Sequence, residues 1–414
     1  MPVKLDSIPP PIVAPSTPRA WRWLLLLAVL LLFGLGLTLW LAGDTLTHQP
    51  GRFWLIALGA PFLIWCGLSL IRAVFYLGTC AVTDGWNGAR EADLARKTRQ
   101  GRRSQQVLAV SVHTALREVG AENGEAQLDA LRNGNKALRV QPGWQVSEEG
   151  FRHSRLPYEQ GESPEMLLRR VLRRVLADIA KVLEKLPEDQ PLAQLLDINT
   201  SVPKEELNKL WLEVWSESCI RQTATPVEGS GLSAVDSWLD HRIHDQALLL
   251  VVASQVAPID VEDTAEAAVG LLFGNRLTQS TLEPLAYLHR PEAEREPTPE
   301  GLLHATRQAL DWVPVEASSI QNAWVAGADS LRTEAITSVL NEASVLAKHK
   351  QGVHDLGVFL GNPGCAAPWV AIAAAVESIR VEGEAHCIFS KNSDGDERLW
   401  CSVVMPPSAN SENI

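Results

Sequence analysis

Two long apolar runs near the start of the chain constrain its fold more than any other feature. The first covers Trp21 to Gly43 and the second Phe53 to Gly78, and each carries a single arginine close to one end and no other charge. A helix that crosses the roughly 30 Å hydrocarbon core of a bilayer needs about 20 apolar residues. The polar segment between the runs, Asp44 to Arg52, is short. We therefore expect two transmembrane helices that form a hairpin.

The length of these runs and their aromatic ends distinguish them from a cleaved signal peptide. Aromatic rings prefer the headgroup region of a bilayer, and five lie near the expected helix ends: Trp21, Trp23, Trp40, Trp54 and Tyr76. A signal peptide has an apolar core of roughly 7–15 residues and an A-x-A-like cleavage site. The first run is longer, no such site ends it, and a second run follows. Both runs are therefore expected to remain in the protein, with residues 21–78 in the membrane.

Positive charge flanks the predicted hairpin on both outer sides. Lys4, Arg19 and Arg22 precede it or stand at its start, whereas the connecting loop carries Arg52 alone. Six more basic residues follow the second run: Arg90, Arg96, Lys97, Arg99, Arg102 and Arg103. Because cytoplasmic flanks are enriched in Lys and Arg, we expect residues 1–20 to form a cytoplasmic tail and the rest of the chain after residue 78 to be cytoplasmic.

Residues 79–106 form a basic segment whose role the sequence leaves open. A cluster of this kind is held against anionic lipid headgroups in some proteins. A solvated helical linker between the membrane and the following domain would have the same composition. Both interpretations predict a connection that ends before an apolar strand, Val107 to Val112.

The acidic balance of the chain argues against nucleic-acid binding. The formal net charge is −12, and neutralising phosphates requires a surplus of Lys and Arg. One predicted helix, residues 165–186, carries four arginines: Arg169, Arg170, Arg173 and Arg174. Between apolar residues at helical spacing, such arginines are typical of a solvated helix face.

Neither a metal nor a cofactor is expected. The six cysteines are scattered, no C-x-x-C pair occurs, and no histidine stands at metal-binding spacing from them. A cytoplasmic domain also has no need of disulfides. His241 and His244 are three residues apart on a predicted helix. Without a third ligand at a fixed spacing, we interpret them as a surface pair.

The chain after residue 106 alternates apolar runs of strand length with amphipathic helical runs, which is typical of an α/β fold. One order of elements occurs twice: helix, buried strand, polar turn, paired strand. The first set is 231–243, 247–253 and 265–273, and the second is 366–379, 386–390 and 399–405. The repeat predicts two similar halves, residues 107–290 and 300–407. A proline-rich segment, residues 291–299, joins them, and residues 408–414 are expected to be a disordered tail.

A duplicated α/β half with these elements resembles the thiolase-like fold of β-ketoacyl synthases over roughly residues 107–406. In the first half, VLAVSV from Val107, GSGLSAVDSWLDHRI from Gly229 and AEAAVGLLF from Ala265 resemble an opening strand, the helix behind the nucleophile and a later strand. In the second half, residues 322–336 resemble the segment of the first catalytic His. Residues 359–376 resemble the Gly-rich turn and helix of the second catalytic His or Asn. The resemblance implies stacked αβαβα layers.

The catalytic residues of that family are matched only in part. Its chemistry uses a nucleophilic Cys at a helix start, together with two His or one His and one Asn. The expected nucleophile position holds Glu228 and the first His segment holds Val325, whereas Asn362 matches the Asn of some members. Cys365, three residues later, is an alternative nucleophile; packing as a small apolar residue is the simpler interpretation. The sequence therefore predicts no catalytic site and no enzyme activity.

A membrane hairpin joined to such a domain resembles the adaptor proteins that load lipase effectors onto the type VI secretion machinery. The resemblance implies a bacterial inner-membrane protein whose partners are a secreted lipase effector and a spike protein. Pairing of thiolase-like folds implies a homodimer. The alternative function is an acyl-thioester condensing or hydrolysing enzyme that uses Cys365 and Asn362. A third interpretation is a structural component of a membrane complex without a small ligand.

Overall fold

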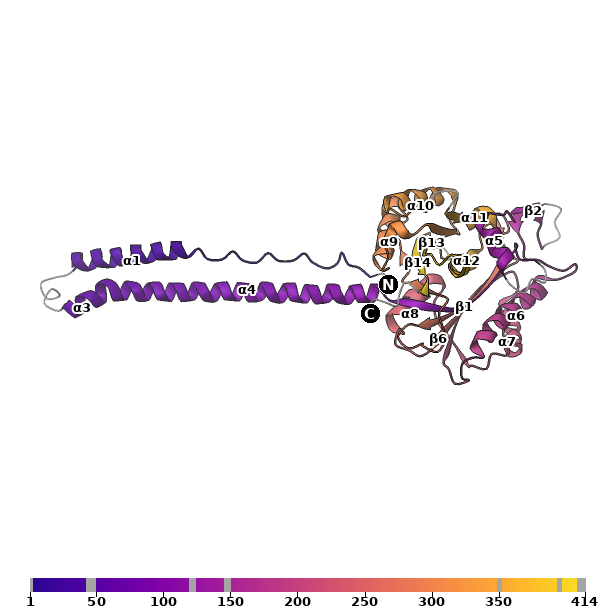
Figure 1. Cartoon of the computed structure of the whole chain (residues 1–414), viewed down its shortest axis with the longest axis horizontal. Helices are drawn as coiled ribbons and strands as arrows, with labels where there is room; N and C mark the ends of the chain where they lie inside the picture. Colours follow the sequence, from indigo (N-terminus) through magenta and orange to yellow (C-terminus); the bar gives the residue numbers. More distant parts are fainter. Residues whose placement is uncertain are drawn as a thin grey trace. The chain divides into compact units, whose positions relative to one another are not determined.

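The computed structural model describes residues 3–41, 50–118, 124–144, 150–347, 352–392 and 397–407 (Figure 1). The chain divides into two compact units. Residues 4–98 form the helical unit, and residues 99–414 together with the first three residues form the α/β unit. The predicted loop 44–52 lies largely outside the described residues, and the predicted tail 408–414 lies entirely outside them.

The helical unit consists of two antiparallel helical segments that lie side by side. The first is α1 (Ala20–Leu41), and the second runs from α3 (Pro50–Trp54) through the π-helix η1 (Leu55–Gly59) into α4 (Ala60–Gly101). The indole Nε1 of Trp65 donates to the carbonyl of Trp23 at 2.8 Å. Eleven residues further along α1, Gly34 is close to Ala57 and Pro61. The missing side chain of Gly34 permits this approach, because a Cβ there would lie 2.2 Å from Cγ of Pro61.

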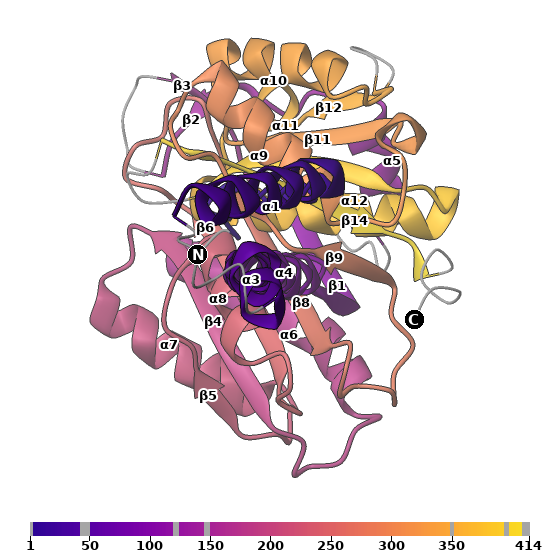
Figure 2. The ribbon, with the colours of Figure 1, turned by 90° about the vertical axis from the view of Figure 1, so that its left-hand side faces the viewer.

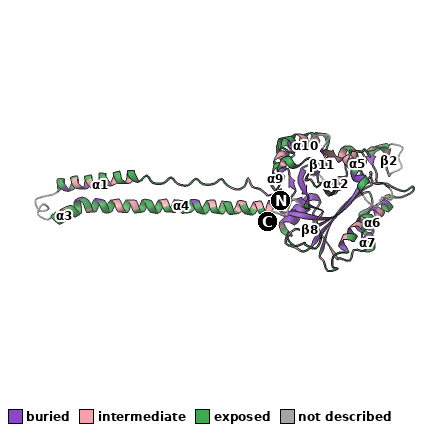
Figure 3. Cartoon of the chain, viewed as in Figure 1, coloured by how far each residue is buried: buried purple, intermediate pink, exposed green. Residues whose placement is uncertain are grey.

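Three helices of the described residues are long and apolar enough to cross a membrane: Ala20–Leu41, Pro50–Gly101 and Gly364–Glu382. Only 11% of the most apolar window of each of the first two is buried within the protein, against 78% for the third. The first two therefore present apolar side chains outward (Figure 3). The third is a core helix.

The predicted linker, residues 79–106, is not a separate segment. Residues 79–101 continue α4 without interruption, and strand β1 (Ser104–Thr114) begins three residues before the predicted start at Val107. The basic residues of this stretch are thus on a helix and at its end. The last turn of α4, from Arg99, belongs to the α/β unit.

The main sheet of the α/β unit is built from two halves with the same strand order. The first half contains β1, β4 (Leu192–Thr200), β5 (Ala224–Pro226), β6 (Leu248–Val256) and β8 (Ala267–Asn275). The second contains β9 (Ala286–His289), β11 (Asn322–Ala326), β12 (Val353–Asp355), β13 (His386–Lys391) and β14 (Leu399–Met405). If the five strands of each half are numbered along the chain, their order across the sheet is 3-2-4-5-1 in both halves. The two parallel and two antiparallel pairings also correspond, which confirms the predicted duplication.

The junction between the halves differs from the predicted one. Antiparallel pairing of β1 with β9 joins the two halves, and the short β10 (Glu292–Ala293) is added beside β14. Strand β9 is the first strand of the second half, although the predicted boundary placed it in the first half. The four residues of β9 are too few to show a strand period, and only their pairing reveals the assignment.

Helices cover both outer faces of the sheet and fill the space between the halves (Figure 2). Apolar side chains of α6 (Pro164–Leu183) and α7 (Lys204–Glu217) pack on the first half, and those of α9 (Pro299–Asp311) and α10 (Ser330–Glu342) on the second. Between the halves lie α8 (Gly231–His241) and α12 (Ala367–Glu382). The unit therefore has five layers, αβαβα.

Strand β6 shows how the sequence produces these layers. Leu249, Val251 and Ala253 contribute to the central core beside α8 and α12. Their neighbours Leu248, Leu250 and Val252 contribute to the core beneath α6. Because successive side chains point to opposite faces of a sheet, a strand covered on both faces carries consecutive apolar residues, as β6 does from Leu248 to Ala253.

Helix α6 confirms the expected amphipathic pattern. The hydroxyl of Ser163 accepts the N–H of Met166 at 3.2 Å and caps the helix start, and Pro164 follows at the first position. The arginines lie on the solvated side, where three form ion pairs: Arg169 with Glu213, Arg170 with Glu162 and Arg173 with Glu217. These contacts account for the charges without a nucleic-acid ligand.

A buried charged group holds the end of α4 within the α/β unit. The side chain of Arg290, which follows β9, has no solvent exposure. Its guanidinium contacts Asp236 at 2.6 Å and Asp240 at 2.8 Å, both on α8, and donates to the carbonyl of Gln100 at 3.2 Å. Gly101 packs against the ring of Trp312, where a Cβ would lie within 2.6 Å of the indole. The contacts of Gln100 and Gly101 therefore attach the end of α4 to this unit.

Smaller elements complete the α/β unit. They are α5 (Glu125–Arg132), α11 (Leu356–Phe359), the 3-10 turns η2 (Ala317–Ser319) and η3 (Gly364–Ala366), and a three-stranded sheet of β2 (Arg139–Pro142), β3 (Gly150–Ser154) and β7 (Thr264–Ala265). Through Thr264, which forms a bridge with Asn362, the small sheet reaches the turn before η3.

Candidate functional site

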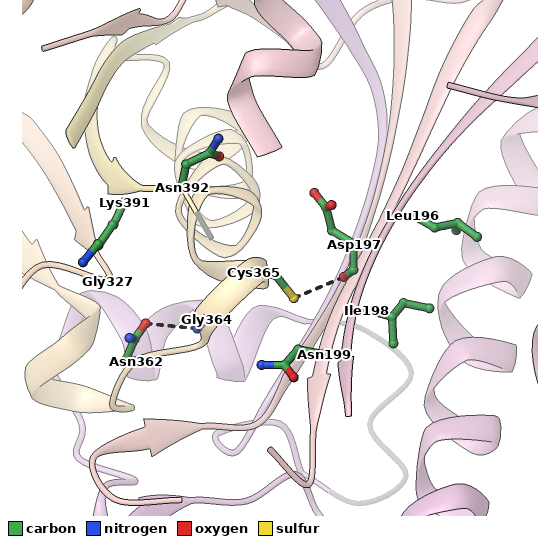
Figure 4. Close-up of a pocket in the computed structure, with 10 residues that line it drawn as sticks. All are labelled: Leu196, Asp197, Ile198, Asn199, Gly327, Asn362, Gly364, Cys365, Lys391 and Asn392. Carbon is green, nitrogen blue, oxygen red and sulfur yellow. Dashed lines mark hydrogen bonds between the residues drawn. The ribbon is translucent and has the colours of Figure 1, made fainter. Parts of the chain in front are cut away.

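A polar pocket of about 500 Å³ lies where the two halves meet, at the carboxyl ends of β4, β11 and β13 (Figure 4). In α/β folds, ligands bind beyond the carboxyl ends of the strands. Ten residues line the pocket: Leu196, Asp197, Ile198, Asn199, Gly327, Asn362, Gly364, Cys365, Lys391 and Asn392.

The start of α8, near this pocket, carries no cysteine or histidine. The helix begins at Gly231, whose φ of +50° favours glycine. A Cβ at this position would lie 1.6 Å from Oδ1 of Asn392. The same Oδ1 accepts the N–H of Leu232 at 3.0 Å, and the carboxylate of Asp197 accepts the N–H of Gly231 at 2.9 Å. The space and the first two backbone donors of this helix are therefore occupied by side chains of the protein.

The second half repeats this arrangement at the start of η3 and α12. Gly364 has a φ of +54°, and a Cβ there would lie 1.9 Å from Oε1 of Gln255. Gln255 belongs to β6, the strand that corresponds to β13, after which Asn392 follows directly. Each half thus places an amide side chain where the other half's central helix would need room for a Cβ. The duplication extends to single residues.

Asp197 is the buried acid of the pocket, with 7% of its surface exposed. Its Oδ2 accepts the N–H of Gly231 and, at 3.2 Å, the indole N–H of Trp369 on α12. These charge-assisted hydrogen bonds compensate for burial of the carboxylate. They also connect β4 of the first half to the central helices of both halves.

The thiol of Cys365 faces backbone carbonyls. Its Sγ lies 3.3 Å from the carbonyl oxygen of Asp197 and 3.4 Å from that of Ser254, in positions to donate to both. Donation requires the protonated thiol, whereas the thiolate is the nucleophile. The ten lining residues include no histidine to take the proton.

Of the four residues predicted for the site, two lie in the pocket and two do not. Asn362 and Cys365 line the pocket together, and the side chain of Asn362 caps η3 by accepting the N–H of Gly364 at 3.0 Å. Glu228 is exposed in the segment before α8 and does not line the pocket, because the helix starts three residues later. Val325 is buried in β11 against the outer core, and Gly327, two residues on, lines the pocket instead.

Sequence reasoning did not single out Asp197, Lys391 or Asn392 as site residues. Asp197 is the sixth of the nine residues of β4, whose burial alternates only in part, so the sequence around it gives a weak signal for a buried acid. Asn392 lies at the start of a polar turn, where asparagine is common. Its role depends on Gly231, which is 161 positions earlier and which no local pattern connects to it.

A second cavity of about 820 Å³ adjoins the first and shares Gly327, Asn362 and Lys391 with it. Its lining combines charged residues, among them Asp329, Arg332 and Asp355, with apolar ones. Two of the apolar residues are exposed, Leu331 and Val358. The two cavities together form a polar pocket that opens into a broader groove of mixed character.

A Ser–His–Asp cluster elsewhere does not have the order of a hydrolase triad. Oγ of Ser111 donates to Oδ2 of Asp178 at 2.8 Å, and Nε2 of His113 lies 3.3 Å from the same Oγ. In a triad the serine donates to the histidine, and the histidine to the acid. Burial and the neighbouring Arg117 lower the pKa of His113 to about 3, so its imidazole is neutral at physiological pH.

No metal site emerges from the part of the chain that the structure describes, where no three His, Cys, Asp or Glu side chains are grouped to hold an ion. His241 is exposed at the end of α8 and is hydrogen-bonded to Ser237 of its own helix. The paired-histidine motif therefore gains no third ligand among the described residues.

Comparisons with known proteins show the fold. No family model matches the sequence, and no curated protein matches it. Among solved structures, the ishigamide ketosynthase/chain length factor superposes with a TM-score of 0.53 at 14% identity, covering 73% of this chain and 99% of that one. A chain from a type II PKS acyl-carrier protein in complex with its ketosynthase gives 0.52 at 11% identity, covering 73% and 99%. An oxazolomycin ketosynthase domain of Streptomyces albus JA3453 gives 0.50 at 10% identity, covering 75% of each.

The α/β unit has the thiolase-like fold of ketosynthases. This agrees with the expectation from the duplicated pattern. At 10–14% identity the likeness concerns the fold and not the chemistry.

Proposed function

We propose that this chain is a membrane-anchored, non-catalytic binding protein. In this role the helical unit spans the bacterial inner membrane and the thiolase-like unit recruits a partner protein in the cytoplasm. The start of α8 supports the proposal: this helix, which resembles the one behind the nucleophile of ketosynthases, begins at Gly231, and Asn392 fills the space where a larger side chain would lie. A thiolase-like fold without catalytic activity would retain its shape and its surfaces for binding.

The membrane part of the proposal rests on α1 and on the segment from α3 to α4. Their apolar side chains face outward over about the length that a bilayer core requires. The flanking arginines favour a cytoplasmic location for both ends. The cysteines offer a direct test. In spheroplasts, a membrane-impermeant maleimide should label Cys219, which is exposed, only after permeabilisation. A cysteine introduced as His48→Cys in the connecting loop should be labelled without it; the reverse result would invert the topology.

The finer form of the proposal is an adaptor or chaperone for a lipase effector of a type VI secretion system, which acts as a homodimer. It rests on the general organisation of a membrane hairpin followed by a thiolase-like domain whose sequence does not match the family's catalytic Cys and first His. Gentle detergent extraction should co-purify a specific partner protein at a fixed stoichiometry. Native mass spectrometry of the purified chain should give twice its 45.3 kDa mass. A monomeric mass would refute the homodimer. Failure to retain a partner would refute the adaptor function.

The competing function is a thioester-handling enzyme, because Cys365 and Asn362 line one pocket. The two functions are separated by incubating the full chain with acyl-CoA and acyl-carrier thioesters and measuring its intact mass. A binding protein stays unmodified. Acylation that Cys365→Ala abolishes and Cys219→Ala leaves intact would establish the enzyme and refute the proposal.

A further inference from the structure

The N-terminal segment of the helical unit lies along the part of α4 that follows the predicted membrane span (Figure 1). Asn87 binds both backbone groups of one residue in this segment. Its Nδ2 donates to the carbonyl of Ile12, and its Oδ1 accepts the N–H of Ile12, both at 3.0 Å. Three residues earlier, the carbonyl of Pro9 accepts Nε of Arg90 at 2.9 Å. These contacts recognise the backbone of the segment and not its side chains.

Lys97 extends the contact toward the end of the helix. Its Nζ donates to the carbonyl of Lys4 at 3.2 Å and to Oγ of Ser7 at 2.9 Å. Between residues 81 and 99, the positions that are less exposed than the others are 83, 87, 90, 93, 94, 97 and 98. Positions three or four apart lie on the same face of a helix. One face of α4 is therefore covered over about four turns.

The spacing of the contacts matches a polyproline II segment on an α-helix. Residues 9–11 are three prolines, each with φ fixed near −65°. Because a polyproline II helix has three residues per turn, Pro9 and Ile12 lie on the same side of the segment. Asn87 and Arg90, also three apart, are neighbours on the surface of α4. The two repeats coincide at both contacts.

The hydrogen-bonding groups of the two surfaces are complementary. Prolines have no N–H, so the segment presents mainly carbonyl acceptors. The backbone N–H groups inside an α-helix are used within the helix. The donors must therefore come from side chains, and Asn87, Arg90 and Lys97 supply them. Prolines also lose little conformational freedom on docking, which favours a proline-rich ligand for such a surface.

The contact is of a kind that opens readily. All five hydrogen bonds between the segment and α4 are exposed to solvent. Each contributes little net stability, because folding exchanges hydrogen bonds with water for hydrogen bonds within the protein. Residues 9–14 are themselves exposed, so the segment is held from one side only.

We propose that residues 4–12 form a detachable strap. The strap docks on α4 in a polyproline II conformation and, while docked, denies the face of Asn87, Arg90 and Lys97 to any other extended segment. This inference goes beyond the proposed function and does not depend on the adaptor role. It requires only that residues 4–12 and 87–97 lie on the same side of the membrane.

The test is hydrogen–deuterium exchange of the full chain in detergent, read by mass spectrometry. A fragment of residues 9–14 carries three amides, because residues 9–11 are prolines, and one of these, that of Ile12, donates to Asn87. An amide exchanges only when its hydrogen bond opens. The Ile12 amide should exchange on the order of tenfold more slowly than in a synthetic peptide of residues 3–14. Exchange at the rate of the free peptide overturns the strap.

Two variants of the helix examine the named donors. Asn87→Ala removes both bonds to Ile12 and should bring its amide to the rate of the free peptide. Arg90→Met removes the bond to Pro9 and should speed exchange of the same amide several-fold, on the order of the loss of one hydrogen bond. Arg96→Met is the matched control, because Arg96 is exposed and pairs with Asp93 of its own helix. Protection that survives Asn87→Ala overturns the assignment.

A variant of the segment examines the polyproline II conformation. Pro10→Ala combined with Pro11→Ala leaves both contact residues in place and loosens the chain between them. Protection of the Ile12 amide, relative to the matching free peptide, should fall on the order of tenfold. Pro18→Ala, beyond the last contact, is the control and should change nothing. Unchanged protection in the double variant overturns the polyproline II conformation of the strap.

Partner capture separates this inference from the proposed function. If the Ile12 amide is protected as expected but no partner co-purifies with the chain, the adaptor is wrong and the strap stands. If a partner co-purifies while the amide exchanges at the rate of the free peptide, the strap is wrong and the adaptor stands.

Discussion

The packing of Asn392 against Gly231 at the start of α8 predicts that substitutions at these two positions have non-additive effects on stability. In Gly231→Ala, the residue is strained at positive φ by about 1–2 kcal/mol. Its Cβ also displaces Asn392, which leaves the buried N–H of Leu232 without a partner at a cost of about 1–3 kcal/mol. The free energy of unfolding should therefore fall by roughly 2–5 kcal/mol. Asn392→Ala alone loses the same hydrogen bond and should cost about 1–3 kcal/mol.

The double variant Gly231→Ala/Asn392→Ala shows whether the two substitutions remove one shared contact or act independently. Once the methyl group introduced by Gly231→Ala has displaced Asn392, truncating that asparagine side chain removes nothing further. The double variant should thus be about as stable as Gly231→Ala alone, with a coupling of about 1–3 kcal/mol between the two sites. The assay is urea unfolding of the full chain in mild detergent, followed by tryptophan fluorescence, with equal slopes required for comparison. Costs that add within about 0.5 kcal/mol would refute the reasoning.

A control at another positive-φ glycine isolates the backbone term. Gly161 has a φ of +85° and nothing within 4 Å of a built Cβ. Gly161→Ala should therefore cost about 1–2 kcal/mol and should add to Asn392→Ala without coupling. The corresponding pair of the second half, Gly364 and Gln255, should repeat the coupled behaviour, since its built Cβ approaches the amide oxygen to 1.9 Å.

Three further predictions concern the buried charges and the unit boundary. Arg290→Met leaves Asp236 and Asp240 without their cation and should lower the free energy of unfolding, measured by urea titration, by about 3–5 kcal/mol. The control Arg307→Met breaks an exposed ion pair and should lower it by less than about 1 kcal/mol. Burial raises the pKa of Glu292 to about 7, above its unfolded value of 4.5, so the protein loses stability as the pH rises from 4.5 through 7. Urea unfolding of Glu292→Gln should match the wild type at about pH 4 and show greater stability than the wild type at about pH 8. A fragment that begins at Arg99 should require more urea to unfold than one that begins at residue 104, because the latter loses the contacts of Gln100 and Gly101; equal midpoints would contradict this boundary.

The layers of the α/β unit were predictable because the faces that an element buries determine the spacing of its apolar residues in the sequence. The all-apolar run of β6 and the spaced apolar residues of α6 reflect how many faces each element covers. The repeated order of helix and strands revealed the duplication for the same reason. Pairing between distant strands leaves no such trace, and β9 was therefore assigned to the wrong half.

The candidate site was predictable only where a local motif marks it. The turn that carries Asn362 and Cys365 contains glycines and a proline at a helix start, which is a local signal. The contact of Gly231 with Asn392 depends on two segments from different halves. A residue chosen by similarity to a motif, Glu228, fell three positions short of the helix start because the exact onset of a helix is poorly marked in sequence.

Helix α12 has a consequence for biosynthesis. Its composition would suit a membrane span, yet it ends up packed against strands of both halves, from β1 to β13. It is synthesised after the two other helices that are long and apolar enough to cross a membrane. Strands β13 and β14 follow it directly, so part of its cover is synthesised only afterwards. Until the second half closes, α12 lacks part of the apolar surface that covers it, and an exposed apolar helix favours aggregation of the nascent chain.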